Sequence, residues 1–253
     1  MSEPHDLVLF AHLARKPDSE LDLERAALLV AETEYPGLDV ASYISKLDGL
    51  GQLARQRLKS LGLDPAAAGF AHAEGMNAIL RLLYQELGFR GNVGDYYDPR
   101  NSFLNDVIDR RTGIPITLAI VLCGVCRRAG VEAVGLSFPG HFLVRTRRRG
   151  GEPMFVDPFD GRALEPSQLQ ALYESATGDP GEIDERFLEP ARRRQVVARM
   201  LNNLRAIYEV RGDRERLQRV LERMAVVSPS EEVRSRLDLL VRNAALQPRV
   251  SVN

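Results

Sequence analysis

A nearly unbroken apolar stretch in the middle of the chain, from Gly113 to Cys126, most strongly constrains the fold. It is shorter than the roughly 20 apolar residues that span a bilayer, so it belongs in the core of a globular domain. Pro115 suits a first helical turn, where its missing N–H group is not needed. Gly130 then stops the helix, since glycine readily takes the left-handed conformation found there. The sequence predicts a buried helix from about Pro115 to Arg128.

Three β-rich segments follow this helix and predict a small antiparallel sheet. They cover residues 131–137, 142–146 and 154–156, and Gly150-Gly151 marks a turn between the last two. His141 stands at the start of the second segment, and Asp157 stands at the end of the third.

The order of a helix start, a strand histidine and a strand aspartate is that of cysteine-dependent acyl-transfer enzymes. Here Pro115 occupies the helix start where a thiol is needed, and neither neighbouring isoleucine can replace it. Thr117 carries a hydroxyl, but inside the first turn we expect it to bond back to a backbone carbonyl. Losing the nucleophile of such a unit costs about a million-fold in turnover. The residues indicate an enzyme scaffold without the enzyme's reaction; a non-thiol nucleophile working with His141 and Asp157 is the alternative.

The remaining polar candidates each have a structural interpretation. His141 is expected to be a partly buried imidazole bonded to Asp157, an arrangement that orders two strands, with ligand binding as the alternative. These two residues are too few for a metal site, and the other histidines lack ligand spacing, so we predict no metal and no cofactor. Cys123 and Cys126 lie in the middle of the predicted helix, away from the N-terminus that activates thiols, and are expected to be inert core residues.

A polar cluster precedes the central helix. Asp98, Asn101 and Asn105 are accounted for by capping and turn formation, with a place along a groove, together with Thr117, as the alternative. Ser102 is expected to cap the short helix that follows it.

Helical patterns flank this central region. Residues 5–61 and 72–88 have apolar residues at helical spacing, and Pro17-Asp18-Ser19 offers caps for the second helix. After a linker at Asp179-Pro180-Gly181, residues 190–246 are again helical, with the turn spacing of a tetratricopeptide-like repeat. Fewer than two such repeats fit, so we expect this segment to pack on the main domain. The expected domains are residues 1–180 and 181–253.

The composition sets limits on partners and location. The chain of 253 residues is 44% hydrophobic and has a net charge of -1, with a pI of about 6.5. This balance predicts no nucleic-acid partner. The first residues lack the pattern of a secretory signal, and no membrane contact is expected, so we expect a cytoplasmic protein.

Several strings carry a resemblance to a known family. The chain resembles the bacterial SirB-type family, described as regulators of SirC expression with transglutaminase-like and tetratricopeptide-like parts. The resemblance covers most of the chain and is most specific between residues 86 and 160. The strings that carry it are residues 86–92, 96–105, 113–118, 138–144 and 156–159.

This resemblance implies both a fold and a role. The implied fold is α+β and mainly helical: a transglutaminase-like (papain-like) core with a small antiparallel sheet, then a short helical tetratricopeptide-like segment. The superfamily's cysteine falls on Pro115, and its histidine and aspartate fall on His141 and Asp157, so these are vestigial triad positions. We therefore expect a non-catalytic regulatory or interaction module in the cytoplasm, with a protein or peptide partner. An acyl-transfer or hydrolytic enzyme is the alternative.

Overall fold

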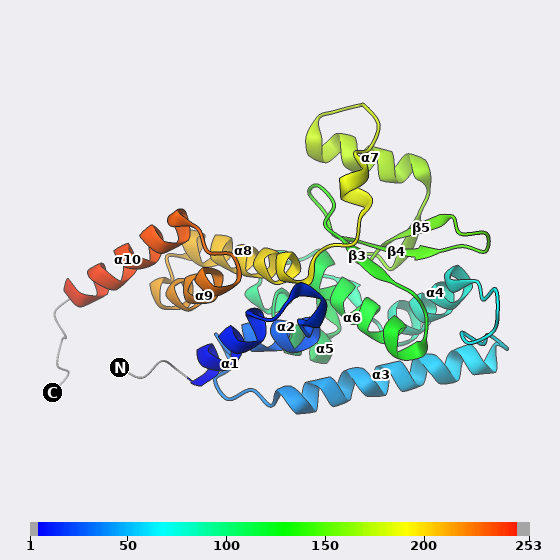
Figure 1. Cartoon of the computed structure of the whole chain (residues 1–253), viewed down its shortest axis with the longest axis horizontal. Helices are drawn as coiled ribbons and strands as arrows, with labels where there is room; N and C mark the ends of the chain where they lie inside the picture. Colours follow the sequence, from blue (N-terminus) through cyan, green and yellow to red (C-terminus); the bar gives the residue numbers. More distant parts are fainter. Residues whose placement is uncertain (1–4, 247–253) are drawn as a thin grey trace. The chain divides into compact units, whose positions relative to one another are not determined.

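The structure, a computed structural model, describes residues 5–246 (Figure 1). The fold is α+β and mainly helical, as expected. The chain divides into two compact units, one formed by residues 39–192 and the other by residues 1–38 together with 193–253. No helix among residues 5–246 has the length and apolar character that crossing a membrane requires.

The helix α6 (Pro115–Ala129) forms the centre of the 39–192 unit and is buried along nearly its whole length. It ends at Gly130, whose φ of 80° is left-handed, so the start and end predicted from the sequence are confirmed. The long helix α3 (Val40–Ser60) packs along it (Figure 1). The two come close at Gly51, where a Cβ atom would stand 2.4 Å from Cβ of Arg128.

Shorter helices complete the helical part of this unit. They are α4 (His72–Leu80), which continues as a π-helical turn η2 (Arg81–Glu86), the 3-10 turn η3 (Pro99–Asn101) and α5 (Leu104–Arg110). The predicted cap at Ser102 is wrong: α5 begins at Leu104, and Phe103 occupies its N-cap position. The Ser102 N–H instead closes the preceding turn by donating to the Pro99 carbonyl at 2.9 Å.

The antiparallel sheet follows α6 with the strand order β3-β4-β5-β6. Three strands lie where the sequence predicted them: β3 (Val134–Leu136), β4 (Leu143–Arg147) and β5 (Pro153–Asp157). The strand β6 (Arg162–Leu164) and the helix α7 (Pro166–Thr177) were not predicted. Both join a second apolar cluster, in which Leu164, Leu169 and Tyr173 pack with buried residues of β3 and β4.

A separate pair of parallel two-residue strands lies before α6. It joins β1 (Arg90–Gly91) to β2 (Thr112–Gly113), with Gly91 opposite Gly113. Because β2 leads directly into α6, this pair ties the loop after Gly91 to the start of the central helix.

The other unit contains helices from both ends of the chain. They are α1 (His5–Ala14), the 3-10 turn η1 (Asp18–Glu20), α2 (Leu23–Ala31), α8 (Arg193–Arg211), α9 (Arg214–Val227) and α10 (Glu231–Leu246). Successive helices α8, α9 and α10 pack against one another, while α1 packs on α9 and α2 packs on α8.

A remote aspartate caps α8. The Asp18 carboxylate accepts the N–H groups of Arg193 and Arg194, at 3.1 and 2.8 Å. The sequence assigned this stretch to the cap of the next helix, but Asp22 has that role and accepts from Arg25 N–H at 3.1 Å.

The two units divide the chain differently from the expected boundary between residues 180 and 181. Residues 181–192 stay with the sheet, where the Ala191 N–H donates to the Gly135 carbonyl at 2.8 Å and Arg145 donates to the Leu188 carbonyl at 2.7 Å. Residues 1–38 instead belong with the C-terminal helices, because the packing faces of α1 and α2 are covered by α9 and α8.

Candidate functional site

The expected histidine–aspartate pair is present. His141 lies just before β4 and Asp157 ends β5, and these adjacent antiparallel strands bring the two side chains together. The distance from His141 Nε2 to Asp157 Oδ2 is 3.0 Å. The imidazole side chain is 20% exposed and the carboxylate 7%, so the histidine is partly open to solvent while the aspartate is buried.

A tight turn fixes the position of Asp157. Its Oδ1 atom accepts the Phe159 N–H at 2.8 Å, and its carbonyl accepts the Gly161 N–H at 2.9 Å. The Tyr84 hydroxyl donates to the Pro158 carbonyl at 2.5 Å. Burial, and after it the negative charge of Asp157, raise the pKa of Tyr84 well above its ordinary value, so this hydroxyl stays a donor.

Gly161 is required at the end of this turn. Its φ of 67° is left-handed, and a Cβ atom there would stand 2.2 Å from the Tyr84 ring. Tyr84 therefore contacts this turn twice, through its hydroxyl at Pro158 and its ring at Gly161, and both carboxylate oxygens of Asp157 have partners.

At the start of α6, the one side-chain hydroxyl is hydrogen-bonded to backbone groups. Pro115 is its first residue and is buried, and Thr117 is fully buried one turn in. Thr117 Oγ1 accepts the Ile114 N–H at 3.2 Å. As a donor, the same hydroxyl lies 2.7 Å from the carbonyl oxygen of Asn101 and 3.1 Å from that of Ile114. The expectation that this hydroxyl bonds to a carbonyl is confirmed. It is neither exposed nor activated.

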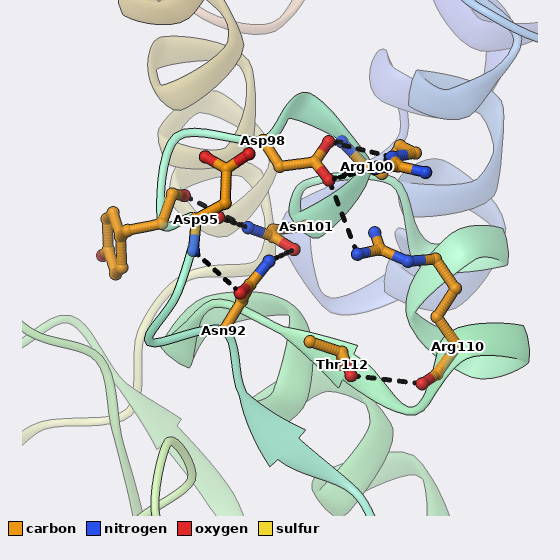
Figure 2. Close-up of polar contacts among 8 residues, drawn as sticks. Asn92, Asp95, Asp98, Arg100, Asn101, Arg110 and Thr112 are labelled. Carbon is orange, nitrogen blue, oxygen red and sulfur yellow. Dashed lines mark hydrogen bonds and ion pairs between the residues drawn. The ribbon is translucent and has the colours of Figure 1, made fainter.

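The polar cluster before α6 organises a loop (Figure 2). The fully buried Asn101 donates through Nδ2 to the carbonyls of Asp95 and Tyr96, at 2.8 and 3.2 Å. Its Oδ1 accepts from Asn92 Nδ2 at 3.0 Å, and Asn92 Oδ1 accepts the Asp95 N–H at 3.0 Å. Asn101 therefore has the turn-forming role that was expected from the sequence.

Asp98 caps the short turn η3. It accepts the Arg100 N–H at 3.0 Å and the Arg100 guanidinium at 2.7 Å, and Arg110 lies 3.5 Å away. Burial alone would raise the pKa of Asp98, but the hydrogen bonds from Arg100 and the charge of Arg110 outweigh it and lower the pKa below 3.8. Asn105 is buried on α5. Asp98 and Asn105 are thus both buried.

Gly91 connects the turn after Asp157 to the start of α6. Its N–H donates to the Phe159 carbonyl at 2.8 Å, and the Phe159 ring lies so close that a Cβ atom on Gly91 would stand 2.4 Å from it. Gly91 is also paired with Gly113, two residues before Pro115. A continuous line of contacts therefore runs from Asp157 through Phe159 to the start of α6. That Pro115 directly faces His141 stays a prediction.

The roles of Tyr84, Gly91, Asn92 and Phe159 were not predicted from the sequence. Gly91, Asn92 and Phe159 lie within the strings that carry the family resemblance, so the sequence did contain a signal for these three residues. Tyr84 lies 74 residues from the carbonyl it bonds, and nothing local in the sequence marks it.

The two cysteines lie in the second half of α6. Cys126 is fully buried, with its sulfur 3.9 Å from that of Met76, while Cys123 is half-buried. Burial, together with the neighbouring Cys123, raises the pKa of Cys126 well above 9.0. Among the residues that the structure describes, no three potential metal-ligating side chains come together.

Comparison with known proteins places the chain in a class. Residues 41–202 match the transglutaminase-like superfamily, and the chain belongs to it. Within that superfamily it belongs with the UPF0162 proteins. It is 36% identical over 229 residues to a UPF0162 protein of Xylella fastidiosa, a match that covers 89% of this chain and 78% of the relative.

Two further relatives show how widely the similarity extends. A UPF0162 protein of Pseudomonas aeruginosa is 31% identical over 229 residues, covering 89% of this chain and 79% of the relative. F-box only protein 21 of Mus musculus is 41% identical over 85 residues, which is 34% of this chain and 13% of that protein. The transglutaminase-like part of the expected resemblance is therefore confirmed, whereas the SirB name and the tetratricopeptide-like repeat stay predictions.

Proposed function

We propose that this protein is a non-catalytic regulatory or protein-interaction module of the cytoplasm, built on a transglutaminase-like core, with a protein or peptide partner. One observation carries the proposal: Pro115 is the first residue of α6. The family resemblance implies that the superfamily's cysteine falls at this position. The one hydroxyl of that turn, on Thr117, is buried and bonded to the backbone.

The histidine–aspartate pair fits a structural role within this proposal. Asp157 has a partner on each oxygen, the His141 imidazole on one and the Phe159 N–H on the other. Such an arrangement fixes the start of β4 against the end of β5 and would support a partner bound next to them. Without a thiol to activate, the imidazole has no acid–base task of the usual kind.

The alternative is an acyl-transfer or hydrolytic enzyme that uses His141 and Asp157 with a non-thiol nucleophile. The observation that favours it is the partial exposure of the His141 side chain, which leaves the imidazole within reach of a substrate or a water molecule. We also propose α8 and α9 as a peptide-binding surface, because tetratricopeptide-like helix pairs bind peptides.

Turnover measurements distinguish the two functions. Wild-type protein and His141→Ala are assayed against activated esters, peptide amides, and glutamine peptides supplied with an amine acceptor. We expect no turnover above buffer from either protein, because the nucleophile is missing. Turnover by the wild type that disappears in a folded His141→Ala variant would overturn the non-catalytic proposal and support the alternative.

A restored thiol tests the premise that Pro115 occupies the nucleophile position. In Pro115→Cys we expect the new thiol to have a pKa of about 7.5 or lower, because the α6 N-terminus and His141 favour the thiolate. Pro166→Cys is the matched control, since Pro166 is also the first residue of a helix but is exposed and not part of this region. The same thiol pKa in both variants would contradict the premise.

A further inference from the structure

The loop after β1 exposes an unusual amount of apolar side chain. Val93 is 83% exposed, Tyr97 71% and Tyr96 45%. The Tyr96 ring lies 5.5 Å from that of Tyr97 and 6.2 Å from that of Phe159, with planes inclined by 78° and 48°. These four residues, Val93, Tyr96, Tyr97 and Phe159, are called the aromatic surface below. Its rings stand at angles to one another rather than in a flat stack.

The loop is held in this conformation from inside. Asn101, which is fully buried, donates to the carbonyls of Asp95 and Tyr96, and Asn92 accepts the Asp95 N–H (Figure 2). The backbone that carries the exposed tyrosines is thus fixed by a buried side chain. Fixing a loop before binding lowers the entropy that a partner must overcome. Fixed, exposed aromatic residues are also the residue type that contributes most at protein interfaces.

The charge of this loop indicates what would bind. Asp95 is exposed, and among residues 91–97 it is the only carboxylate or basic group. Two nearby arginines are paired, Arg100 with Asp98 and Arg162 with Asp160, while Arg90 precedes the loop and is exposed. A lysine or arginine side chain can lay its aliphatic stem on tyrosine rings while its cation meets ring faces and a carboxylate.

We propose that the aromatic surface binds a peptide segment that presents a lysine or arginine side chain, held by Tyr96, Tyr97 and Asp95. The proposal rests on the proposed binding function and names the chemistry of its partner. Phe159 lies two residues after Asp157, so the bound segment passes beside the histidine–aspartate pair.

Short peptides of randomised sequence test this surface. Each set of peptides carries lysine, arginine, glutamate or serine at the same fixed positions. The dissociation constant of the tightest-binding peptide in each set is measured by fluorescence anisotropy, and the four constants are compared. We expect the lysine and arginine peptides to bind about tenfold or more tightly than the glutamate peptides. Equal binding of acidic and basic peptides, or no binding of the basic ones, overturns the proposal.

Two substitutions locate the binding and its charge preference. Tyr97→Ala should weaken the basic peptides about tenfold, as expected for an interface aromatic. Asp95→Asn should remove most of the preference for lysine over serine. Val210→Ala and Glu182→Gln are the matched controls, since Val210 is 90% exposed and Glu182 is exposed, both outside the loop. Unchanged binding in Tyr97→Ala overturns the proposal.

Two more outcomes separate this proposal from the function on which it rests. Self-association at rising concentration, lost in Tyr97→Ala, would show that a second copy covers the surface and would overturn the peptide proposal alone. A purified partner that binds Tyr97→Ala as well as the wild type would also overturn the proposal, while the interaction module stands. Turnover that depends on His141 would instead contradict the proposed function.

Discussion

Single side chains in the central region are explained by their immediate partners. The Thr117 hydroxyl is buried between backbone groups, Asp98 is paired with two arginines, and Asp157 has a partner on each carboxylate oxygen. The sequence indicated the His141–Asp157 pair because both residues stand at ends of neighbouring strands. It could not indicate Tyr84, since that contact depends on how distant elements pack.

Cys126 should be chemically silent in the folded protein. Its full burial raises the thiol pKa well above the ordinary value, so the thiolate that reacts with alkylating reagents is scarce. We expect iodoacetamide to label Cys126 only on unfolding and to label Cys123 slowly, as measured by mass spectrometry of the cysteine-containing peptide. Fast labelling of either thiol in native protein, with a depressed thiol pKa, would contradict this.

Elements were predictable from the sequence where they carry their own signals. The helix α6 has a long apolar run, a proline at its first turn and a terminating glycine, and the structure matches on each count. The strand β6 has three residues, of which Arg162 and Ala163 are exposed, and α7 buries little beyond Leu169 and Tyr173. Both elements depend on a neighbouring surface, which a local pattern does not reveal.

The first turn of α6 should depend on the Thr117 hydroxyl. Thr117→Val leaves the buried Ile114 N–H without the threonine oxygen, so we expect a loss of about 1–3 kcal/mol in unfolding free energy. Thr117→Ser keeps the oxygen and should lose less. Thr177→Val, which removes a hydroxyl bonded to the Tyr173 carbonyl near the end of α7, should cost about 0.5 kcal/mol or less. Equal losses in Thr117→Val and Thr177→Val, measured by urea denaturation, would be inconsistent with this role.

At the scale of the whole molecule, chain order and spatial grouping differ. The apolar spacing of α8, α9 and α10 was visible in the sequence, but their partners α1 and α2 lie at the other end of the chain. Asp18 caps α8 across 175 residues, and Arg216 holds Glu34 at 2.5 and 2.8 Å across 182. Periodicity predicts a helix, but it carries no information about which distant helix will cover its apolar face.

The C-terminal helices should therefore not fold alone. A fragment of residues 186–253 lacks α1 and α2, leaving faces of α8 and α9 and the N-terminus of α8 uncovered. We expect it to be largely unfolded by circular dichroism, since a few helices without their packing partners bury too little apolar surface. Joining residues 1–38 to residues 193–253 through a flexible linker should restore a cooperative thermal transition.

The control for the joined protein is Leu28→Asp. Leu28 is fully buried on α2, and a charge there should abolish the transition because the carboxylate would be buried without a partner. Arg25→Ala changes an exposed residue of the same helix, paired with Asp22, and should leave the transition nearly intact. A cooperative melt of the 186–253 fragment by itself would show that α1 and α2 are dispensable. A joined protein that stays unfolded would show that these helices need more of the chain than the two ends supply.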